Sequence, residues 1–424
     1  MADKADSTPT TMTKTLASRL ANIVPFHVME LQKMAAALEA DGKSIIHLGI
    51  GEPDFTAPPQ VIEAATVAMQ NGHLQYTPAL GILPLRQAIS DHYRDVYGVE
   101  VGAERIVITA GASGALLLAC AALVEKGSEV LMPDPCYPCN RHFVAAFEGR
   151  SKCVPCGPES RFQLTDNMVK NHWGPDTKGV LLASPSNPTG TSIPPSTLSS
   201  IINTVHSKNG FVIVDEIYGG LTYTNDSPKP FTALSLSSDI IIINSFSKYF
   251  HMTGWRLGYL IIPAALLPAI EKLSQNLFIC PSVIAQHAAL ACFQPSTLCT
   301  YSARLAELAT RRAFIIPALK SLGWEIPVEP DGAFYVYCDV SRWTADADSL
   351  TREILRDVGV VVVPGMDFGV WGAKKYVRVS YAQRMEKLGE AVERLRGFFE
   401  GRRPLRGEGL VKDDVRHEGM VVEE

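Results

Sequence analysis

The sequence lacks long apolar runs and lacks a strong excess of charge of either sign. Its longest apolar stretches, such as residues 239–244 and 259–263, have only the length of a strand, far short of the ~20 apolar residues of a membrane span. The 39 Lys and Arg residues against 44 Asp and Glu residues leave a net charge of −5, without a strongly basic block. We therefore expect no membrane segment and no nucleic-acid partner.

A secretory leader and a disulfide framework are also not indicated. The N-terminal residues MADKADSTPTTMTKTL contain no apolar core, and Asp3 and Asp6 argue against a transit peptide. Nine cysteines are an odd number, and they fit reduced thiols in an intracellular protein of 424 residues better than paired ones. These features predict a cytoplasmic protein whose N-terminus is flexible.

Short apolar runs alternate with helical patterns from about residue 104 onward. Strands are expected at 105–109, 129–132, 179–183, 211–214, 239–244 and 257–261, with helices at 112–123 and 194–206 among them. Near-continuous Val, Ile and Leu runs separated by helices are typical of a parallel or mixed sheet covered on both faces, the α/β class. A ligand is then expected beyond the carboxyl ends of the strands.

The pattern changes toward the C-terminus. Helical stretches at 263–293, broken at Pro281, and at 295–322 precede a run of alternating polarity at 332–340, which predicts an antiparallel strand. A helix at 346–357, strands at 360–363 and 376–380 and a helix at 385–399 follow. This unit of about 100 residues predicts a second, α+β domain.

One segment, SFSKYFHMTGWR at residues 245–256, combines groups that suit a phosphorylated cofactor. Lys248 lies just beyond an apolar strand, between the hydroxyls of Ser245 and Ser247 and the guanidinium of Arg256. Hydroxyls with an arginine can hold a phosphate, and a lysine beside them can form a Schiff base with an aldehyde cofactor. Taken alone, the lysine is better explained as a solvated loop residue.

Three further segments follow predicted strands. Asp215 and Tyr218 end one strand, and a carboxylate held there can pair with a pyridinium nitrogen, although adjacent charges usually mark a solvated rim. Residues 187–190, Asn-Pro-Thr-Gly, can be a simple turn. Residues 111–113, Gly-Ala-Ser, stand where a strand turns into a helix, so their amides can bind an anion or merely open the helix.

In order and spacing together, these segments resemble the class I/II aminotransferases, enzymes of the pyridoxal-phosphate fold type I group. The resemblance covers about residues 46–399 and is carried by SFSKYFHMTGWRLGY, SPSNPTG, VDEIYGGLTY, PDGAFYV and YVRVSYA. It implies a large domain with a mostly parallel seven-stranded sheet, a smaller α+β domain, and pyridoxal 5′-phosphate as cofactor. It also implies transfer of an amino group between an L-amino acid and a 2-oxo acid, by a ping-pong mechanism through an aldimine on Lys248.

The resemblance also implies a role for each matching residue. Lys248, Asp215 and Tyr218 are the expected catalytic residues: the lysine moves the substrate proton, the aspartate pairs with the pyridine nitrogen, and the tyrosine binds the phenolic oxygen. Tyr76 is expected to reach the phosphate of a neighbouring subunit, which implies a homodimer with shared active sites. The expected cofactor contacts are Tyr76, Ala112, Ser113, Tyr137, Asn187, Asp215, Tyr218, Ser245, Ser247, Lys248 and Arg256, and the expected substrate contacts are Gly51, Asn187 and Arg378.

The resemblance also implies where the domains begin and end. We expect a flexible N-terminus at 1–15, a segment at 16–54 that packs with the small domain, a large cofactor-binding domain at 55–300, a small domain at 301–400 and a charged tail at 401–424. The residues MELQKMAAALEA after Val28 indicate by themselves an ordinary amphipathic helix, whereas the resemblance implies that this segment folds over the active site.

Several alternatives remain open at the level of sequence. Two Cys-x-x-Cys pairs, Cys136 with Cys139 and Cys153 with Cys156, have the spacing of a zinc site, but Cys139 is expected to begin a helix and Cys156 to end a strand, so no metal is expected. A pyridoxal-phosphate lyase or synthase would use the same anchors, and a non-catalytic regulator is a weaker alternative. Tyr76, Tyr137 and Phe334 are candidates to line a pocket for an uncharged or aromatic substrate side chain.

Overall fold

The computed structural model describes residues 16–17, 19–20, 23, 27–72, 74–223 and 230–405. The expected flexible N-terminus at 1–15, and the tail beyond residue 405, lie outside the described residues. Among the described helices, none combines the length and the apolar character needed to cross a bilayer.

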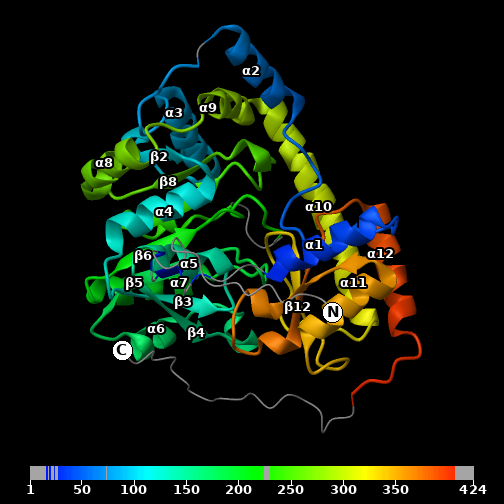
Figure 1. Cartoon of the computed structure of the whole chain (residues 1–424). Helices are drawn as coiled ribbons and strands as arrows, with labels where there is room; N and C mark the ends of the chain where they lie inside the picture. The colour runs from blue at the N-terminus through cyan, green and yellow to red at the C-terminus, as the bar shows by residue number, and fades with distance from the viewer. Residues whose placement is uncertain are drawn as a thin grey trace.

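A seven-stranded sheet forms the centre of the larger part of the molecule (Figure 1). Its order is β2-β8-β7-β6-β5-β3-β4, and β8 runs antiparallel to both of its neighbours while the other paired strands are parallel. The predicted α/β fold with a mostly parallel seven-stranded sheet is therefore confirmed. The strands are β2 (Ile106–Thr109), β3 (Glu129–Asp134), β4 (Arg150–Pro155), β5 (Thr177–Ala183), β6 (Phe211–Asp215), β7 (Ile241–Ser245) and β8 (Gly258–Ile261).

Both faces of this sheet are buried, which explains why its strands are apolar at nearly every position. Successive side chains of a strand point to opposite faces, so Val212 and Val214 belong to one core and Ile213 to another. The Ile213 core contains residues of α4 (Gly111–Leu123), α5 (Pro138–Ala146) and α8 (Leu267–Leu277). The other core contains residues of α2 (Pro59–Gln70), α3 (Leu83–His92), α6 (Asp166–His172), α7 (Pro195–Ser207) and α9 (Val283–Leu290).

A smaller unit is built around an antiparallel sheet, β11-β12-β9. Its strands are β9 (Tyr335–Asp339), β11 (Val363–Pro364) and β12 (Tyr376–Ser380), and its helices are α11 (Ala347–Val358) and α12 (Met385–Phe399). The 27-residue helix α10 (Pro295–Ser321) reaches this unit from the large sheet's side of the molecule (Figure 1).

Residues near the N-terminus lie against this C-terminal unit. Strand β1 (Ile46–His47) pairs in parallel with β10 (Val360–Val361), and helix α1 (His27–Ala40) packs beside α11 (Figure 1). Leu31 and Ala35 of α1 share a buried apolar cluster with Leu355 and Val361. Segments more than 300 residues apart in the sequence thus form one core.

Two predicted strands differ from the structure. The single strand expected at 360–363 is split between two sheets: β10 pairs with β1, and β11 pairs with β12. The strand expected at 332–340 begins only at Tyr335. The break expected at Pro281 is confirmed, since α8 and α9 are separated by a loop that contains this residue. Local periodicity does not encode which partner a short apolar run will find, so these boundaries needed the tertiary fold.

In the described part of the chain, the cysteines do not come together as a set of metal ligands. All nine are free thiols, and no group of three or more His, Cys, Asp or Glu side chains is placed there to hold a metal ion. Cys139 lies in the first turn of α5, and Cys156 directly follows β4. The spacing that resembles a zinc site therefore arises from a helix start and a strand end.

Candidate active site

A cavity of about 310 Å³ opens at the carboxyl ends of the parallel strands. This is where a ligand is expected in an open α/β sheet, because the loops that leave neighbouring strands converge there. Most of the predicted site residues line it: Gly51, Ala112, Ser113, Tyr137, Asn187, Asp215, Tyr218, Ser247, Lys248, Arg256 and Arg378.

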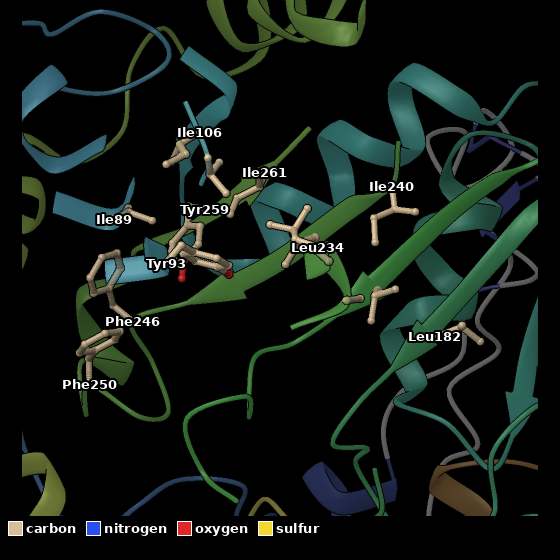
Figure 2. Close-up of a cluster of buried hydrophobic side chains, with 14 of the residues drawn as sticks. Ile89, Tyr93, Ile106, Leu182, Leu234, Ile240, Phe246, Phe250, Tyr259 and Ile261 are labelled. Atoms are coloured by element: carbon tan, nitrogen blue, oxygen red, sulfur yellow. The ribbon is translucent and has the colours of Figure 1, made fainter. Parts of the chain in front are cut away.

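Two phenylalanines anchor the loop that carries Lys248. Phe246 and Phe250 are buried with their ring centroids 5.1 Å apart, inside the core next to Tyr93 (Figure 2). Phe246 and Phe250, two residues to either side of Lys248, hold this loop against the core. Lys248 itself lines the cavity, where its Nζ donates a hydrogen bond to the carbonyl of Gly51. Burial, more than the nearby guanidiniums, lowers the pKa of Lys248 to about 8.

Asp215 and Glu216, adjacent at the end of β6, are both buried but face different surroundings. Asp215 lines the cavity and accepts a hydrogen bond from the Ile217 amide at 3.0 Å. The carboxylate of Glu216 instead accepts hydrogen bonds from Thr232 Oγ1 at 2.8 Å and the Ala233 amide at 2.6 Å. Burial raises the pKa of Asp215 to about 7, so this carboxylate lacks a sufficient cationic partner in the protein alone.

The N-terminus of α4 presents groups that suit an anion at the same end of the sheet. Its N-cap residue Ala110 offers no side-chain hydrogen bond, so backbone amides of the first turn remain available beside Ala112 and Ser113. Gly111 has a φ of +72°, and a Cβ there would lie 2.7 Å from Nη2 of Arg256. The glycine thus lets the guanidinium approach the helix end, where the two favour negative charge together.

Two predicted cofactor residues lie outside the cavity lining. Ser245 is buried behind Ser247, and the two Oγ atoms are 2.9 Å apart. Tyr76 is 83% exposed and does not line the cavity of its own chain. Direct contact of these two residues with the cofactor stays a prediction.

Pyridoxal phosphate suits these groups. The anion site at α4 and Arg256 matches a phosphate, the buried and under-neutralised Asp215 matches a protonated pyridine nitrogen, and Lys248 is a partly deprotonated amine between them. The donor set therefore fits the cofactor at both of its charged ends.

Arg378, on β12 of the smaller unit, enters the cavity from the opposite side. Its Nη1 donates to Asn187 Oδ1 at 2.7 Å and its Nη2 donates to the Gly49 carbonyl at 2.6 Å. The guanidinium carbon lies 4.5 Å from the ring centroid of Tyr335 and 4.8 Å from that of Phe368. Within the described residues its buried Nε has no hydrogen-bond partner. A guanidinium held flat in this way can bind a carboxylate in one plane.

Sequence reasoning missed Tyr335 and selected its neighbour. Phe334, which was expected to line the pocket, is buried and does not line it, whereas Tyr335 does. The Tyr335 hydroxyl lies 2.7 Å from the Tyr218 hydroxyl. A Cβ on Gly51 would lie 2.6 Å from the Tyr335 hydroxyl. The segment PDGAFYV pointed to this strand, but which aromatic faces the cavity depends on where β9 begins.

Helix α1 also contributes to the site. The residues alone predicted an ordinary amphipathic helix, whereas the resemblance implied that this segment folds over the active site, and Val28, Met29 and Gln32 of α1 line the cavity. The apolar face of α1 at Leu31 and Ala35 packs on the smaller unit, so the first turns present a different face to the cavity.

Arg378 gives a direct test of the substrate end of the cavity. We expect Arg378→Ala to raise the KM for the amino donor about 100-fold, because a buried charge-assisted pair with the donor carboxylate is lost. Arg378→Lys should recover only part of this loss, since an ammonium cannot bind a carboxylate in the same planar way. Steady-state kinetics at saturating 2-oxo acid measure the effect. A large loss of bound cofactor with an unchanged KM would contradict the assignment.

Comparison with known proteins agrees with the fold and this site. Residues 43–395 match the family described as aminotransferase class I and II. The valine–pyruvate aminotransferase of Mycobacterium tuberculosis is 38% identical over 91% of this chain and 98% of its own length. A solved aminotransferase structure from Mycobacterium tuberculosis superposes with a TM-score of 0.87 at 38% identity, covering 91% of this chain and 99% of that one. The aspartate aminotransferase structure from Thermotoga maritima gives 0.84 at 32% identity, covering 91% and 100%.

The fold and the site thus define a pyridoxal-phosphate-dependent enzyme of fold type I. The chain belongs to the class I and II aminotransferase family and is a transaminase that acts on amino acids and 2-oxo acids. The predicted family, activity and cofactor are confirmed.

Proposed function

We propose that this transaminase takes its amino group from L-amino acids with uncharged, apolar side chains. The observation that carries this proposal is the number of cations in the cavity. Its lining residues include three, Lys248, Arg256 and Arg378, and no further Lys, Arg or His within the described part of the chain.

Each of these cations already has a partner in the proposed arrangement. Lys248 would hold the cofactor, Arg256 would bind its phosphate, and Arg378 would bind the α-carboxylate of the substrate. Among the described lining residues of this chain, no cation then remains for the second carboxylate of aspartate or glutamate. Asp367, which also lines the cavity, adds a negative charge that disfavours such a group further.

The remaining wall of the cavity is mainly apolar, which suits burial of an aliphatic or aromatic side chain. The relative named valine–pyruvate aminotransferase is in line with such a donor, whereas other relatives are named aspartate aminotransferases. The larger apolar side chains of the lining are Val28, Met29, Ile50, Leu116, Ile217 and Phe368.

The protein's own groups divide the chemistry among them. When bound, the cofactor supplies an electron sink for the carbanion left after the α-proton departs. Asp215 keeps the pyridine nitrogen protonated by placing an opposite charge against it. Lys248, with its lowered pKa, takes the proton from the α-carbon and returns it, and Arg378 orients the carboxylate so that this C–H bond is presented to the lysine.

Asn187 and Tyr218 are proposed to act on the phenolic oxygen of the cofactor. Oδ1 of Asn187 accepts from Arg378, which leaves the amide nitrogen of Asn187 as a donor. The hydroxyl of Tyr218 lies 2.7 Å from that of Tyr335, so it is held in one orientation. Tyr137 lines the same cavity and is proposed to stack on the cofactor ring.

We propose further that the enzyme is a cytoplasmic homodimer. The exposed Tyr76, an aromatic side chain outside its own cavity, supports a contact with the cofactor phosphate of a second subunit. Nine free thiols support a reducing compartment. Pairing of β1 with β10 supports division of the chain near residues 55 and 300, with the N-terminal segment in the smaller domain.

A panel of amino donors tests the substrate class. With pyruvate as acceptor, we expect kcat/KM for valine or leucine to exceed that for aspartate by at least about 100-fold, since a second carboxylate would be buried without a partner. Alanine and pyruvate would only exchange their amino group, so alanine is compared with the other donors in half-reactions without acceptor, where it should fall between them because it buries less apolar surface. Equal or better use of aspartate would overturn the proposal and point to a further cation at the site. If the donor is consumed just as fast without any acceptor, and ammonia or a thiol is released, the result would favour lyase chemistry.

A further inference from the structure

We propose that Asp367 is a positioning residue that fixes α1 as the wall of the substrate side-chain pocket. The proposal rests on the substrate class given above, because it concerns the part of the cavity that receives the apolar side chain. Asp367 lies in the short helix Gly365–Asp367 of the smaller unit, 340 residues along the chain from His27.

Both oxygens of the Asp367 carboxylate cap the start of α1. The His27 amide donates to Oδ1 at 2.9 Å, and the Val28 amide donates to Oδ2 at 3.2 Å. The first amides of any helix need such acceptors, and the residues preceding His27, Val-Pro-Phe, have no side-chain acceptor to offer. The helix therefore depends on a buried carboxylate from a distant segment, which also complements its dipole.

The segment around Asp367 is itself attached to the large sheet. Arg141 Nη2 of α5 donates to the Asp367 carbonyl at 3.1 Å, and the Cys136 amide donates to the Phe368 carbonyl at 2.9 Å. The buried carboxylate of Asp134 accepts hydrogen bonds from the Val370 and Trp371 amides, at 3.0 and 3.3 Å for Oδ2. Loop 367–371 is thus held by the large unit while its first side chain holds α1.

This arrangement links two parts of substrate recognition. Phe368, next to Asp367, packs on the guanidinium of Arg378, which binds the α-carboxylate. The helix that Asp367 caps supplies Val28, Met29 and Gln32 to the cavity wall. A shift of α1 therefore alters the pocket for the side chain more than the clamp for the carboxylate. Asp367 is placed to decide how well large apolar donors are distinguished from small ones.

The test compares two helix caps. Asp367→Ala removes the cap of α1. Asp346→Ala removes the cap of α11, where Asp346 Oδ1 accepts a hydrogen bond from the Asp348 amide at 3.2 Å, and Asp346 does not line the cavity. We expect Asp367→Ala in the holoenzyme to lower the ratio of kcat/KM for leucine over alanine about five- to tenfold, and Asp346→Ala to leave it unchanged. Asp367→Asn, which keeps one acceptor oxygen, should give a smaller loss and serves if the alanine variant fails to fold.

Hydrogen exchange supplies a second readout. Backbone amides at the start of α1 should exchange about tenfold faster in the Asp367 variants and at the wild-type rate in Asp346→Ala. An equal loss of kcat/KM for leucine and alanine, or unchanged exchange in α1, would overturn the role of Asp367. If wild-type enzyme does not prefer apolar donors over aspartate, the substrate proposal fails instead, and exchange in α1 still decides whether Asp367 holds the helix.

Discussion

Replacing Lys248 by alanine is expected to lower the rate of amino transfer by at least about 10⁴-fold while leaving the fold intact. The side chain enters the cavity and packs little core, because Phe246 and Phe250 anchor its loop (Figure 2). No other lysine lines the cavity in the described part of the chain, so no second amine is available to move the α-proton. Half-reactions with valine in excess, followed by absorbance of the bound cofactor, measure the loss.

The lowered pKa of Lys248 explains why this one lysine can serve as a base. An ordinary lysine is almost wholly protonated near neutral pH, whereas a pKa of about 8 leaves a substantial neutral fraction. Burial is the main cause, since it disfavours the ammonium form. Covalent attachment can be checked separately: borohydride reduction of the wild-type holoenzyme should add the cofactor mass to the peptide that contains Lys248.

Lys152 offers a matched control for this substitution. It is a half-buried lysine of β4 that donates to the His172 carbonyl at 2.8 Å, away from the cavity. Lys152→Ala should keep the wild-type rate of transamination, and borohydride reduction should still add the cofactor mass to the peptide that contains Lys248. Cofactor mass on another peptide would disprove the assignment, and so would turnover by Lys248→Ala within tenfold of wild type without added amines.

Asp215→Asn is expected to have opposite effects on activity and on stability. Activity should fall by about 10³-fold or more, because a neutral amide does not keep the pyridine nitrogen protonated. The cofactor-free protein should become more stable than wild type near neutral pH, because a buried carboxylate without a sufficient cation is removed. An ordinary structural aspartate would give a loss of stability instead.

The sign of the pH dependence follows from the direction of the shift. The pKa of Asp215 is about 7 in the folded protein against an ordinary value of 3.8, so the folded state binds the proton more tightly. The protonated Asp215 carboxyl contributes to the free energy of unfolding in full below the ordinary pKa of 3.8. This contribution is lost as the pH rises toward 7, by about 1.4 kcal/mol for each unit between the two pKa values. The advantage of Asp215→Asn over wild type should therefore grow between about pH 4 and pH 7.

Urea unfolding of the two cofactor-free proteins at several pH values measures this difference. Glu216 is present in both proteins, and its pKa is raised to about 7, chiefly by burial and in smaller part by the charge of Asp215, so Asp215→Asn also removes that smaller contribution. Asp176→Asn, at a largely exposed position, controls for the substitution itself. A constant difference between Asp215→Asn and wild type across this range would show that Asp215 is ionised and compensated without the cofactor.

Local sequence was informative where function depends on neighbours in the chain. Asp215, Lys248 and Arg256 each stand in a segment that follows a predicted strand. Because parallel strands end on one side of a sheet, this order predicted that the three residues lie at the same end. Strand β12 and helix α12 have the bounds that their periodicity predicts, residues 376–380 and 385–399. The pair Asp215 and Glu216 was less clear, since two adjacent charges usually indicate a solvated rim, and here both are buried.

Tertiary packing determined the rest of the cavity. Whether Phe334 or Tyr335 faces the site depends on the register of β9 against β12, and a shift of one residue reverses the answer. The contribution of α1 depends on a cap from Asp367, and no local pattern connects residues 340 positions apart.

By itself, then, the sequence predicted the class of fold, the cofactor and the residues proposed to carry the chemistry, because each of these depends on short segments whose geometry is set by a strand and the loop that follows it. Only the tertiary structure decided the shape and charge of the substrate pocket. Its walls come from α1, from the loop at 367–371 and from β9, and these segments meet because buried apolar surface and hydrogen bonds join them across the chain.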